Sequence, residues 1–218
     1  MAEGREIKIK VCGMNNLENL SVIERLNPDY FGFIFFPKSP RNFDRFSIPS
    51  FQNTKKVGVF VNEEIGEIVE LQNQFQLNAV QLHGDEDVDY VNQLKSKLLD
   101  SVEIFKAISV IEEEDFKKIT PFENVVDLII LDTKTKLRGG SGEKFDWRLL
   151  DNYNSDIPFL LSGGIQQGDA EQVSELYDKY DKMLGLDINS KFEIEPGLKD
   201  KIKVERFIKN IENYAVRG

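Results

Sequence analysis

The sequence contains very few of the residues that form disulfides or bind transition metals. Its 218 residues include one cysteine, Cys12, and one histidine, His83. A single cysteine excludes an intramolecular disulfide, and one cysteine with one histidine argues against a zinc cage. By residue type alone, Cys12 is more typical of core packing than of chemistry. Its position in the fold has to decide between the two.

Long apolar runs are also missing. No segment reaches the roughly 20 apolar residues that a membrane-spanning helix needs. The first ten residues, MAEGREIKIK, lack an apolar stretch of signal-peptide length. We therefore expect a cytoplasmic protein with no membrane partner.

Positive charge is in short supply. The chain has 28 Lys and Arg against 38 Asp and Glu, a formal net charge of −10. Because nucleic-acid binding needs clustered cations, this balance argues against nucleic acid as a partner. A small anion can still be held by a few local cations and backbone amides. The densest charged run, residues 111–119, mixes both signs and indicates a solvated helix face.

Short apolar, β-branched runs recur along the chain and predict strands. There are eight of them: IKIKVCG, YFGFIFF, KKVGVFV, NAVQLHG, EIFKAI, DLIILD, IPFLLSGG and KMLGLDI.

Amphipathic segments between these strands predict helices. Apolar side chains fall on one face of four segments: Ile65, Ile68 and Val69; Val91, Leu94 and Leu98; Val173, Leu176 and Tyr177; and Val204, Phe207, Ile208 and Ile211. The weakest helix is expected between the second and third strands, where FDRFSIPSFQN is short and contains Pro49.

Strands that alternate with helices indicate a parallel sheet. Eight strand–helix units in 218 residues give about 27 residues per unit, the size of a compact repeat. Eight such units favour a closed (β/α)8 TIM barrel. No linker or composition break divides the chain, so residues 1–218 are predicted to form one barrel domain.

Chemically active residues follow several of the predicted strands, at the end of a barrel where active sites lie. They are Cys12, Arg41, His83, Asp132, Ser162, Gly163, Gly164, Asp187, Asn189 and Ser190. Each has an ordinary structural explanation by itself, such as a turn histidine, a loop cap or a surface arginine. Together, a thiol, a carboxylate, a guanidinium and two Gly/Ser loops around one mouth are difficult to explain by packing.

The loops after the seventh and eighth strands have the features of a phosphate site. Glycines let backbone N–H groups approach a ligand closely, and these two loops commonly bind phosphate in such barrels. Ser162, Gly163, Gly164, Asn189 and Ser190 supply the donors. A third loop, residues 133–146, is rich in glycine and cations and is predicted to be mobile enough to close over a charged ligand.

The chain resembles the phosphoribosylanthranilate isomerase family of tryptophan biosynthesis, whose fold is a (β/α)8 barrel. The resemblance is carried in order by IKVCGM, FGFIFFPKSPRNF, VGVFVNE, AVQLHGDE, LDTKTKLRGGSGEKFDW, LLSGGI and LDINSKFEIEPGLKD. It implies an Amadori rearrangement of N-(5-phosphoribosyl)anthranilate to the carboxyphenylamino-deoxyribulose phosphate.

The resemblance also implies a role for each candidate residue. Asp132 is expected to be the general acid and Cys12 the general base. Arg41 is expected to pair with the anthranilate carboxylate, while His83 and Asp187 lie near the substrate. No metal or organic cofactor is expected, because the substrate's own iminium ion serves as the electron sink. The expected partner is a small phosphorylated substrate, and the protein is expected to be a monomer or homodimer.

Two other interpretations stay open on the residues alone. One is a different sugar-phosphate barrel, such as a histidine-pathway isomerase or a pentose-phosphate epimerase. The former is expected to use two carboxylates and to have no need for Cys12, and the latter several metal ligands. The other is a catalytically silent phosphosugar-binding barrel, which needs neither an acid nor a base.

Overall fold

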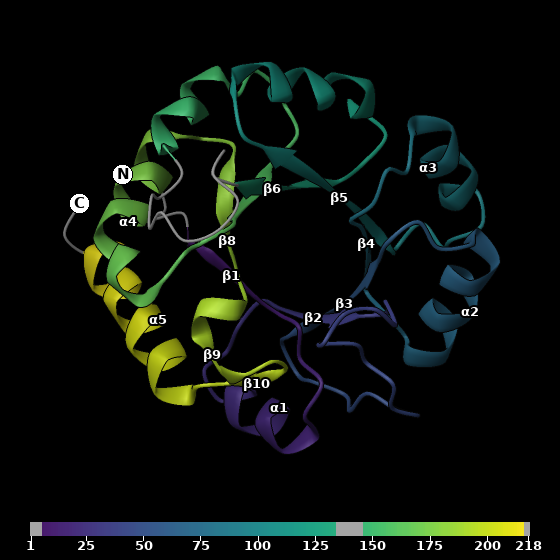
Figure 1. Cartoon of the computed structure of the whole chain (residues 1–218), viewed down its shortest axis with the longest axis horizontal. Coiled ribbons are helices and arrows are strands. Elements are labelled where there is room, and N and C mark those ends of the chain that lie inside the picture. The colour runs from purple at the N-terminus through teal and green to yellow at the C-terminus, as the bar shows by residue number, and fades with distance from the viewer. Residues whose placement is uncertain (1–5, 134–145, 216–218) are drawn as a thin grey trace.

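Eight parallel strands close into one barrel in the computed structural model, which describes residues 6–133 and 146–215 (Figure 1). Every strand pairs with its neighbours in chain order, and the last pairs with the first. The strands are β1 (Lys8–Cys12), β2 (Tyr30–Ile34), β3 (Lys55–Phe60), β4 (Ala79–Leu82), β5 (Glu103–Val110), β6 (Leu128–Thr133), β7 (Phe159–Ser162) and β8 (Met183–Ile188). All eight predicted strands and the barrel are confirmed.

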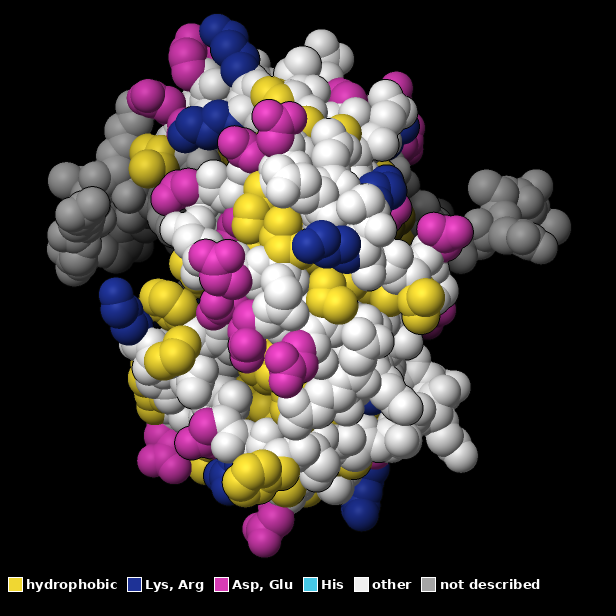
Figure 2. Space-filling view, turned by 90° about the vertical axis from the view of Figure 1, so that its right-hand side faces the viewer, with side chains coloured by type: hydrophobic (Ala, Val, Ile, Leu, Met, Phe, Trp, Pro, Cys, Tyr) yellow, Lys and Arg dark blue, Asp and Glu magenta, His cyan; other side chains and the backbone are white. Residues whose placement is uncertain are grey.

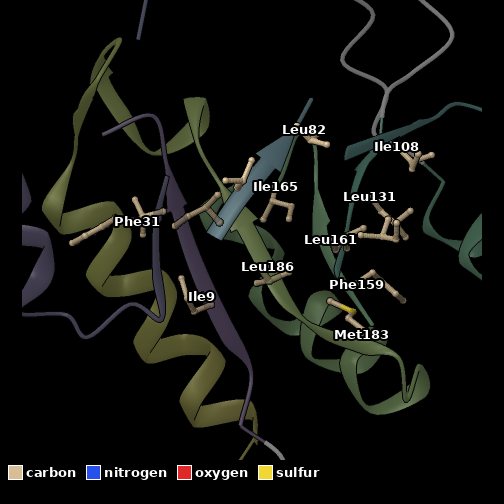
Figure 3. Packing of buried hydrophobic residues seen from close by; sticks show 14 of the residues in the cluster. Ile9, Phe31, Leu82, Ile108, Leu131, Phe159, Leu161, Ile165, Met183 and Leu186 are labelled. Carbon is tan, nitrogen blue, oxygen red and sulfur yellow. The ribbon is translucent and has the colours of Figure 1, made fainter. Parts of the chain in front are cut away.

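Alternation along each strand separates two apolar layers. On β1, Ile9 and Val11 belong to the outer cluster, which packs between the strands and the surrounding helices (Figure 3). Lys10 and Cys12 occupy the alternate positions, which face the barrel interior. The inner apolar cluster consists of Tyr30, Val57, Ala79, Phe105, Ala107, Leu128, Ile130 and Leu160. The middle of the interior is therefore apolar, and polar side chains such as Lys10 lie toward the carboxyl ends of the strands.

Five α-helices surround the barrel among the residues that the structure describes (Figure 1). They are α1 (Leu17–Glu24), α2 (Ile65–Phe75), α3 (Val88–Lys95), α4 (Ala170–Lys179) and α5 (Lys201–Ala215). Asn16 and Asp87 cap α1 and α3, each accepting a hydrogen bond from a backbone N–H of the first turn. The four predicted apolar faces point inward, although Leu98 lies beyond the end of α3 and packs there as a partly buried residue.

The predicted helix over residues 43–53 is wrong. This segment contains no helix and crosses the outside of β2 as an irregular connection. Pro49 lacks an N–H and disfavours helical backbone at the residue before it. Two aromatic contacts hold the segment against β2 instead. The ring centroids are 5.1 Å apart in Phe33–Phe43 and 5.0 Å apart in Phe31–Phe51. Edge-to-face ring packing covers β2 where a helix was expected.

Short 3-10 helices complete the outer layer. They are η1 (Glu113–Lys118), η2 (Thr120–Phe122), η3 (Trp147–Asn152), η4 (Gln167–Asp169) and η5 (Ser190–Phe192). The charged run at 111–119 forms η1, in which only Phe116 is buried, so its predicted solvated face is confirmed.

A small hairpin that the sequence patterns did not predict follows β8. Its strands are β9 (Glu193–Glu195) and β10 (Leu198–Lys199), which pair antiparallel. Gly197 has a φ of 86° in the turn, a backbone conformation that glycine adopts without strain. The hairpin places Glu193 and Lys199 beside the mouth of the barrel.

The outer surface carries mixed charge. On the face that includes α2 and α3, acidic and basic side chains lie among separated hydrophobic ones (Figure 2). None of the helices within residues 6–133 and 146–215 combines the length and apolar character needed to span a membrane.

Candidate active site

A cavity of about 430 Å³ opens at the carboxyl ends of the strands. It is lined by nine of the ten predicted site residues: Cys12, His83, Asp132, Ser162, Gly163, Gly164, Asp187, Asn189 and Ser190. The register of the strands explains why several of these residues lie together: Asp132 pairs with Ser162, and Ser162 pairs with Asp187, on successive strands. Arg41 is the predicted residue that does not line the cavity.

A buried ion pair forms the floor beneath Cys12. The Lys10 Nζ lies 2.9 Å from Asp187 Oδ1, and both side chains are almost wholly buried. These two residues are also direct register partners across β1 and β8. Burial opposes the charge on Lys10, but Asp187 and Cys12 outweigh it, so the pKa of Lys10 lies above its ordinary value. Lys10 is therefore an ammonium ion held within the barrel.

Neighbouring groups act in opposite directions on the pKa of the Cys12 thiol. Its side chain is buried against the protein yet contributes to the cavity wall. Burial raises the pKa of Cys12, and Lys10 opposes part of that rise. The Asp187 carboxylate adds to the rise, whereas Lys199 reduces it. The thiol is thus open to a ligand and surrounded by charge, which differs from ordinary core packing.

Asp132 and His83 lie next to each other on the cavity wall. His83 Nε2 lies 3.8 Å from Asp132 Oδ2. Behind it, Gln81 Nε2 donates a hydrogen bond to His83 Nδ1 at 2.9 Å. When His83 Nδ1 accepts this hydrogen bond, a neutral ring carries its proton on Nε2, toward Asp132. Among the described residues, the buried Gln81 Oε1 has no hydrogen-bond partner, which leaves an acceptor on the cavity wall.

The loop after β7 is shaped by its two glycines. Gly163 and Gly164 have φ values of 94° and 68°. A Cβ on Gly163 would lie 2.1 Å from the backbone oxygen of Thr133, so only glycine fits there. The space beside Gly164 is open, with no atom within 4 Å of an added Cβ. Ser162 Oγ lies 3.4 Å from Asp187 Oδ2, which links this loop to β8.

Arg41 lies behind the cavity wall, where Glu193 binds it. Its Nε and NH2 atoms contact the Glu193 carboxylate at distances of 2.6–3.0 Å. Lys199 Nζ donates to the same carboxylate at 2.7 Å and to Asn189 Oδ1 at 2.8 Å. A Cβ on Gly13 would lie 2.7 Å from Arg41 Cδ and 2.9 Å from Asn189 Oδ1. The β9–β10 hairpin thereby connects Arg41 to Asn189 on the cavity wall.

A second cavity, of about 580 Å³, adjoins the first and shares Val61, His83 and Asp132 with it. The ion pair of Lys106 and Glu86, with Nζ and Oε2 at 2.8 Å, lies in its wall. Asp132 is therefore reached from both cavities.

The glycine-rich loop predicted to close over the ligand lies, from residue 134 to 145, outside the described residues. Within residues 6–133 and 146–215, no group of three His, Cys, Asp or Glu side chains is placed to hold a metal ion.

Comparison with known proteins identifies the family. The model of the family described as N-(5′-phosphoribosyl)anthranilate (PRA) isomerase matches residues 9–210. The chain belongs to the PRA isomerase family. A curated N-(5′-phosphoribosyl)anthranilate isomerase of Parabacteroides distasonis is 38% identical over 216 residues, covering 95% of both chains.

Solved structures of PRA isomerases have the same fold. The crystal structure of the Thermotoga maritima isomerase has a TM-score of 0.80 and 34% identity, covering 95% of this chain and all of that one. A phosphoribosylanthranilate isomerase in complex with reduced 1-(o-carboxyphenylamino)-1-deoxyribulose 5-phosphate has a TM-score of 0.78 and 30% identity, with coverage of 95% and 100%.

The sequence patterns missed several residues that build the site. Lys10, Gln81, Glu193 and Lys199 lie buried around the cavity or behind it. Lys10 had a visible signal, because a lysine two residues before Cys12 in the strand KIKVC shares its inward face. Glu193 and Lys199 lie within LDINSKFEIEPGLKD, one of the blocks that carry the resemblance, but no periodic pattern marks them, and Arg41 is 152 positions from Glu193.

Proposed function

We propose that the chain catalyses the Amadori rearrangement of N-(5-phosphoribosyl)anthranilate in tryptophan biosynthesis, with Asp132 as general acid and Cys12 as general base. The observation that carries the proposal is that both side chains line one cavity together with the Gly/Ser loops. Membership of the PRA isomerase family supports the substrate. So does the related structure that contains the reduced product analogue.

The acid step falls to Asp132. Its protonated carboxyl gives a proton to the furanose ring oxygen, the C1′–O bond breaks, and the anilino nitrogen's lone pair forms an iminium ion. His83, whose Nε2 lies 3.8 Å from Asp132 Oδ2, can stabilise the carboxylate that remains. An adjacent imidazole with its proton on Nε2 suits this role, because it donates toward the new negative charge.

The base step falls to Cys12. Its thiolate removes the C2′ proton, the C–H electron pair becomes the C1′–C2′ double bond, and the iminium π pair returns to nitrogen. The resulting enolamine ketonises to product. The substrate's iminium is the electron sink, so the step uses no metal or organic cofactor.

Substrate binding uses the groups around the acid and base. Amides near Gly163, Gly164, Asn189 and Ser190 bind the phosphate, assisted by the Ser162 hydroxyl. Arg41, although behind the cavity wall, is proposed to reach the anthranilate carboxylate through NH1, because Glu193 occupies its Nε and NH2 atoms. Asp187 contributes mainly by neutralising Lys10 below the ligand. We further propose that the protein works in the cytoplasm as a monomer or homodimer.

The direct test is to mix the protein with freshly generated phosphoribosylanthranilate and to follow the loss of substrate fluorescence. Isomerase activity in the wild type, absent from Cys12→Ser and Asp132→Asn, is the expected result. A silent phosphosugar-binding barrel would bind the product analogue without changing the fluorescence. Turnover of a different phosphosugar, with none of this substrate, would favour another barrel isomerase.

A further inference from the structure

Lys10 is a fully buried cation immediately below the sulfur of Cys12. Both residues occupy inward positions of β1, two residues apart, and none of the Lys10 side chain is exposed. A buried ammonium is costly unless charges or dipoles compensate it. Lys10 Nζ donates a hydrogen bond to Asp187 Oδ1 at 2.9 Å, and Asp187 and Cys12 together hold the pKa of Lys10 above its ordinary value despite its burial. The isomerase steps described above give this lysine no part.

Gly32 is the feature that lets Lys10 and Cys12 meet. It is the direct register partner of Cys12 on the neighbouring strand β2. A Cβ at this position would lie 2.7 Å from Cys12 Sγ and 3.1 Å from Lys10 Nζ. Both distances are shorter than ordinary contacts, so the sulfur and the ammonium border the same small space. Any side chain at residue 32 would push one or both of them away.

The remaining charges around Cys12 come from three other elements. Asp187 on β8 pairs with Lys10 at 2.9 Å and disfavours a thiolate. Lys199 on β10 favours one, and Arg41 also interacts with the sulfur. Both of these cations pair with Glu193, however, at 2.7 Å and 2.6 Å. Lys10 is also paired, with Asp187, but its Nζ and the Cys12 sulfur border the same space at Gly32, so Lys10 is the cation placed to respond when charge appears on the sulfur.

We propose that Lys10 is a positioning residue for the base: its ammonium holds the Cys12 sulfur in place and compensates the thiolate that removes the C2′ proton. This rests on the proposed function of Cys12. In the step, the C2′–H bond breaks and an S–H bond forms, while Lys10 keeps its proton throughout. As the sulfur loses its negative charge, Asp187 remains as the partner of Lys10. Lys10 thus keeps an anionic partner whether the sulfur is a thiolate or a thiol.

The test is the pH at which half of Cys12 is thiolate, measured by the rate of iodoacetamide alkylation. The reaction reports one site, because the chain has a single cysteine. Lys10→Met keeps the length of the side chain and removes its charge, so the midpoint should rise by roughly 1–3 pH units. Gly32→Ala should also raise it, because the added methyl separates the charges. Asp187→Asn should lower it, because the thiolate becomes the main counterion of Lys10.

Lys56→Met is the matched control. Lys56 is another buried lysine on a barrel strand, but its Nζ donates to the backbone oxygen of Phe75, away from Cys12. Its removal should leave the midpoint unchanged. An unchanged midpoint in folded Lys10→Met would overturn the proposal. If Lys10→Met does not fold, unchanged midpoints in both Gly32→Ala and Asp187→Asn would overturn it.

The alkylation midpoint does not depend on turnover. If the wild type failed to isomerise phosphoribosylanthranilate while the midpoints shifted as expected, the proposed function would be wrong and the contact between Lys10 and Cys12 would stand. If the wild type were active and the midpoints did not move, only the role of Lys10 would be wrong. The two proposals therefore fail separately.

Discussion

Glu193 binds Arg41 through both Nε and NH2, at distances of 2.6–3.0 Å, although the two residues are 152 positions apart. The same carboxylate accepts from Lys199 Nζ at 2.7 Å. This pairing fixes the plane of the guanidinium and involves its Nε and NH2 atoms but not NH1. A substrate carboxylate would then complete a chain of alternating charges from the hairpin to the ligand.

The first prediction concerns Arg41. Arg41→Ala should lower kcat/KM mainly by raising KM, because a carboxylate contact present throughout the reaction is uniform binding. The kcat/KM of Arg41→Lys should lie between those of the wild type and Arg41→Ala, because lysine keeps the charge but lacks the planar guanidinium that binds a carboxylate through two hydrogen bonds. Steady-state kinetics measure both. Arg25→Ala, on the exposed end of α1, is the control and should behave as wild type. An unchanged kcat/KM in Arg41→Ala would make Arg41 a structural partner of Glu193 only.

The second prediction concerns acid stability. Burial opposes the charge on Glu193, but hydrogen bonds from Arg41 and Lys199 outweigh it and hold the pKa of Glu193 below its ordinary value. A carboxyl whose folded pKa is depressed stabilises the protein above the unfolded pKa of about 4.3, and this contribution is lost as pH falls through the folded value. Glu193→Gln should therefore have a lower Tm than the wild type at neutral pH. In acid the two Tm values should approach each other.

The control for this prediction is Glu205→Gln. Glu205 pairs with Lys209 on the surface of α5, and an exposed pair of this kind adds little stability. Its Tm should match wild type at every pH. A constant gap in Tm between wild type and Glu193→Gln, from neutral pH down to acid, would contradict the prediction.

Much of the barrel could be predicted from short-range patterns. Strands such as DLIILD are apolar on both faces, because one face packs inside the barrel and the other against helices. Since parallel strands end at one mouth, the residues that follow them had to meet there. This explains why nine predicted residues line one cavity.

What could not be predicted depends on contacts between distant parts of the chain. Lys10 and Asp187 are 177 positions apart and meet only because the barrel closes in that register. The β9–β10 hairpin is too short to give a strand pattern. Residues 43–53 lack a helix partly for a local reason, Pro49, and partly because Phe43 and Phe51 pack edge-to-face on β2, a tertiary contact that local patterns do not reveal.

The third prediction concerns the phosphate loop. Gly163→Ala should destabilise the protein, since its Cβ would meet Thr133 O at 2.1 Å with φ at 94°. Gly164→Ala should fold with a backbone strain of about 1–2 kcal/mol, because no atom obstructs the new methyl. If this loop binds phosphate as proposed, that methyl would project toward the ligand, and inhibition by inorganic phosphate should weaken. Melting curves and inhibition constants measure the two effects. If inorganic phosphate inhibited Gly164→Ala as strongly as it inhibits the wild type, the phosphate would bind elsewhere.

A crystal grown with sulfate gives an independent check on this loop. The anion should lie on the amides near Gly164 and Asn189. An anion found instead at the amino-terminal face of the barrel would overturn the site assignment.

The fourth prediction concerns Asp132. A general acid must be protonated when the substrate arrives, so we expect its pKa to be raised in the complex with the anionic substrate. Asp132→Asn keeps the shape but cannot give up a proton, and kcat should fall by about 10²–10⁴-fold. Binding of the reduced product analogue, measured by calorimetry, should be retained. Asp100→Asn, at an exposed position, is the control. Wild-type turnover in Asp132→Asn would remove Asp132 from the mechanism.

The last prediction returns to Cys12 and separates packing from catalysis. A packing cysteine replaced by serine would bury a hydroxyl and mainly lower Tm, with activity retained at low temperature. A catalytic base replaced by serine should leave Tm nearly unchanged, because the hydroxyl faces a polar cavity beside Lys10 and Asp187. It should lower kcat by about 10²–10⁴-fold, which corresponds to roughly 3–5 kcal/mol of barrier. Iodoacetamide should inactivate the wild type, and the bound product analogue should protect it. Melting curves and kcat measured on the same Cys12→Ser sample decide between these outcomes, and we expect a stable, folded and nearly inactive protein.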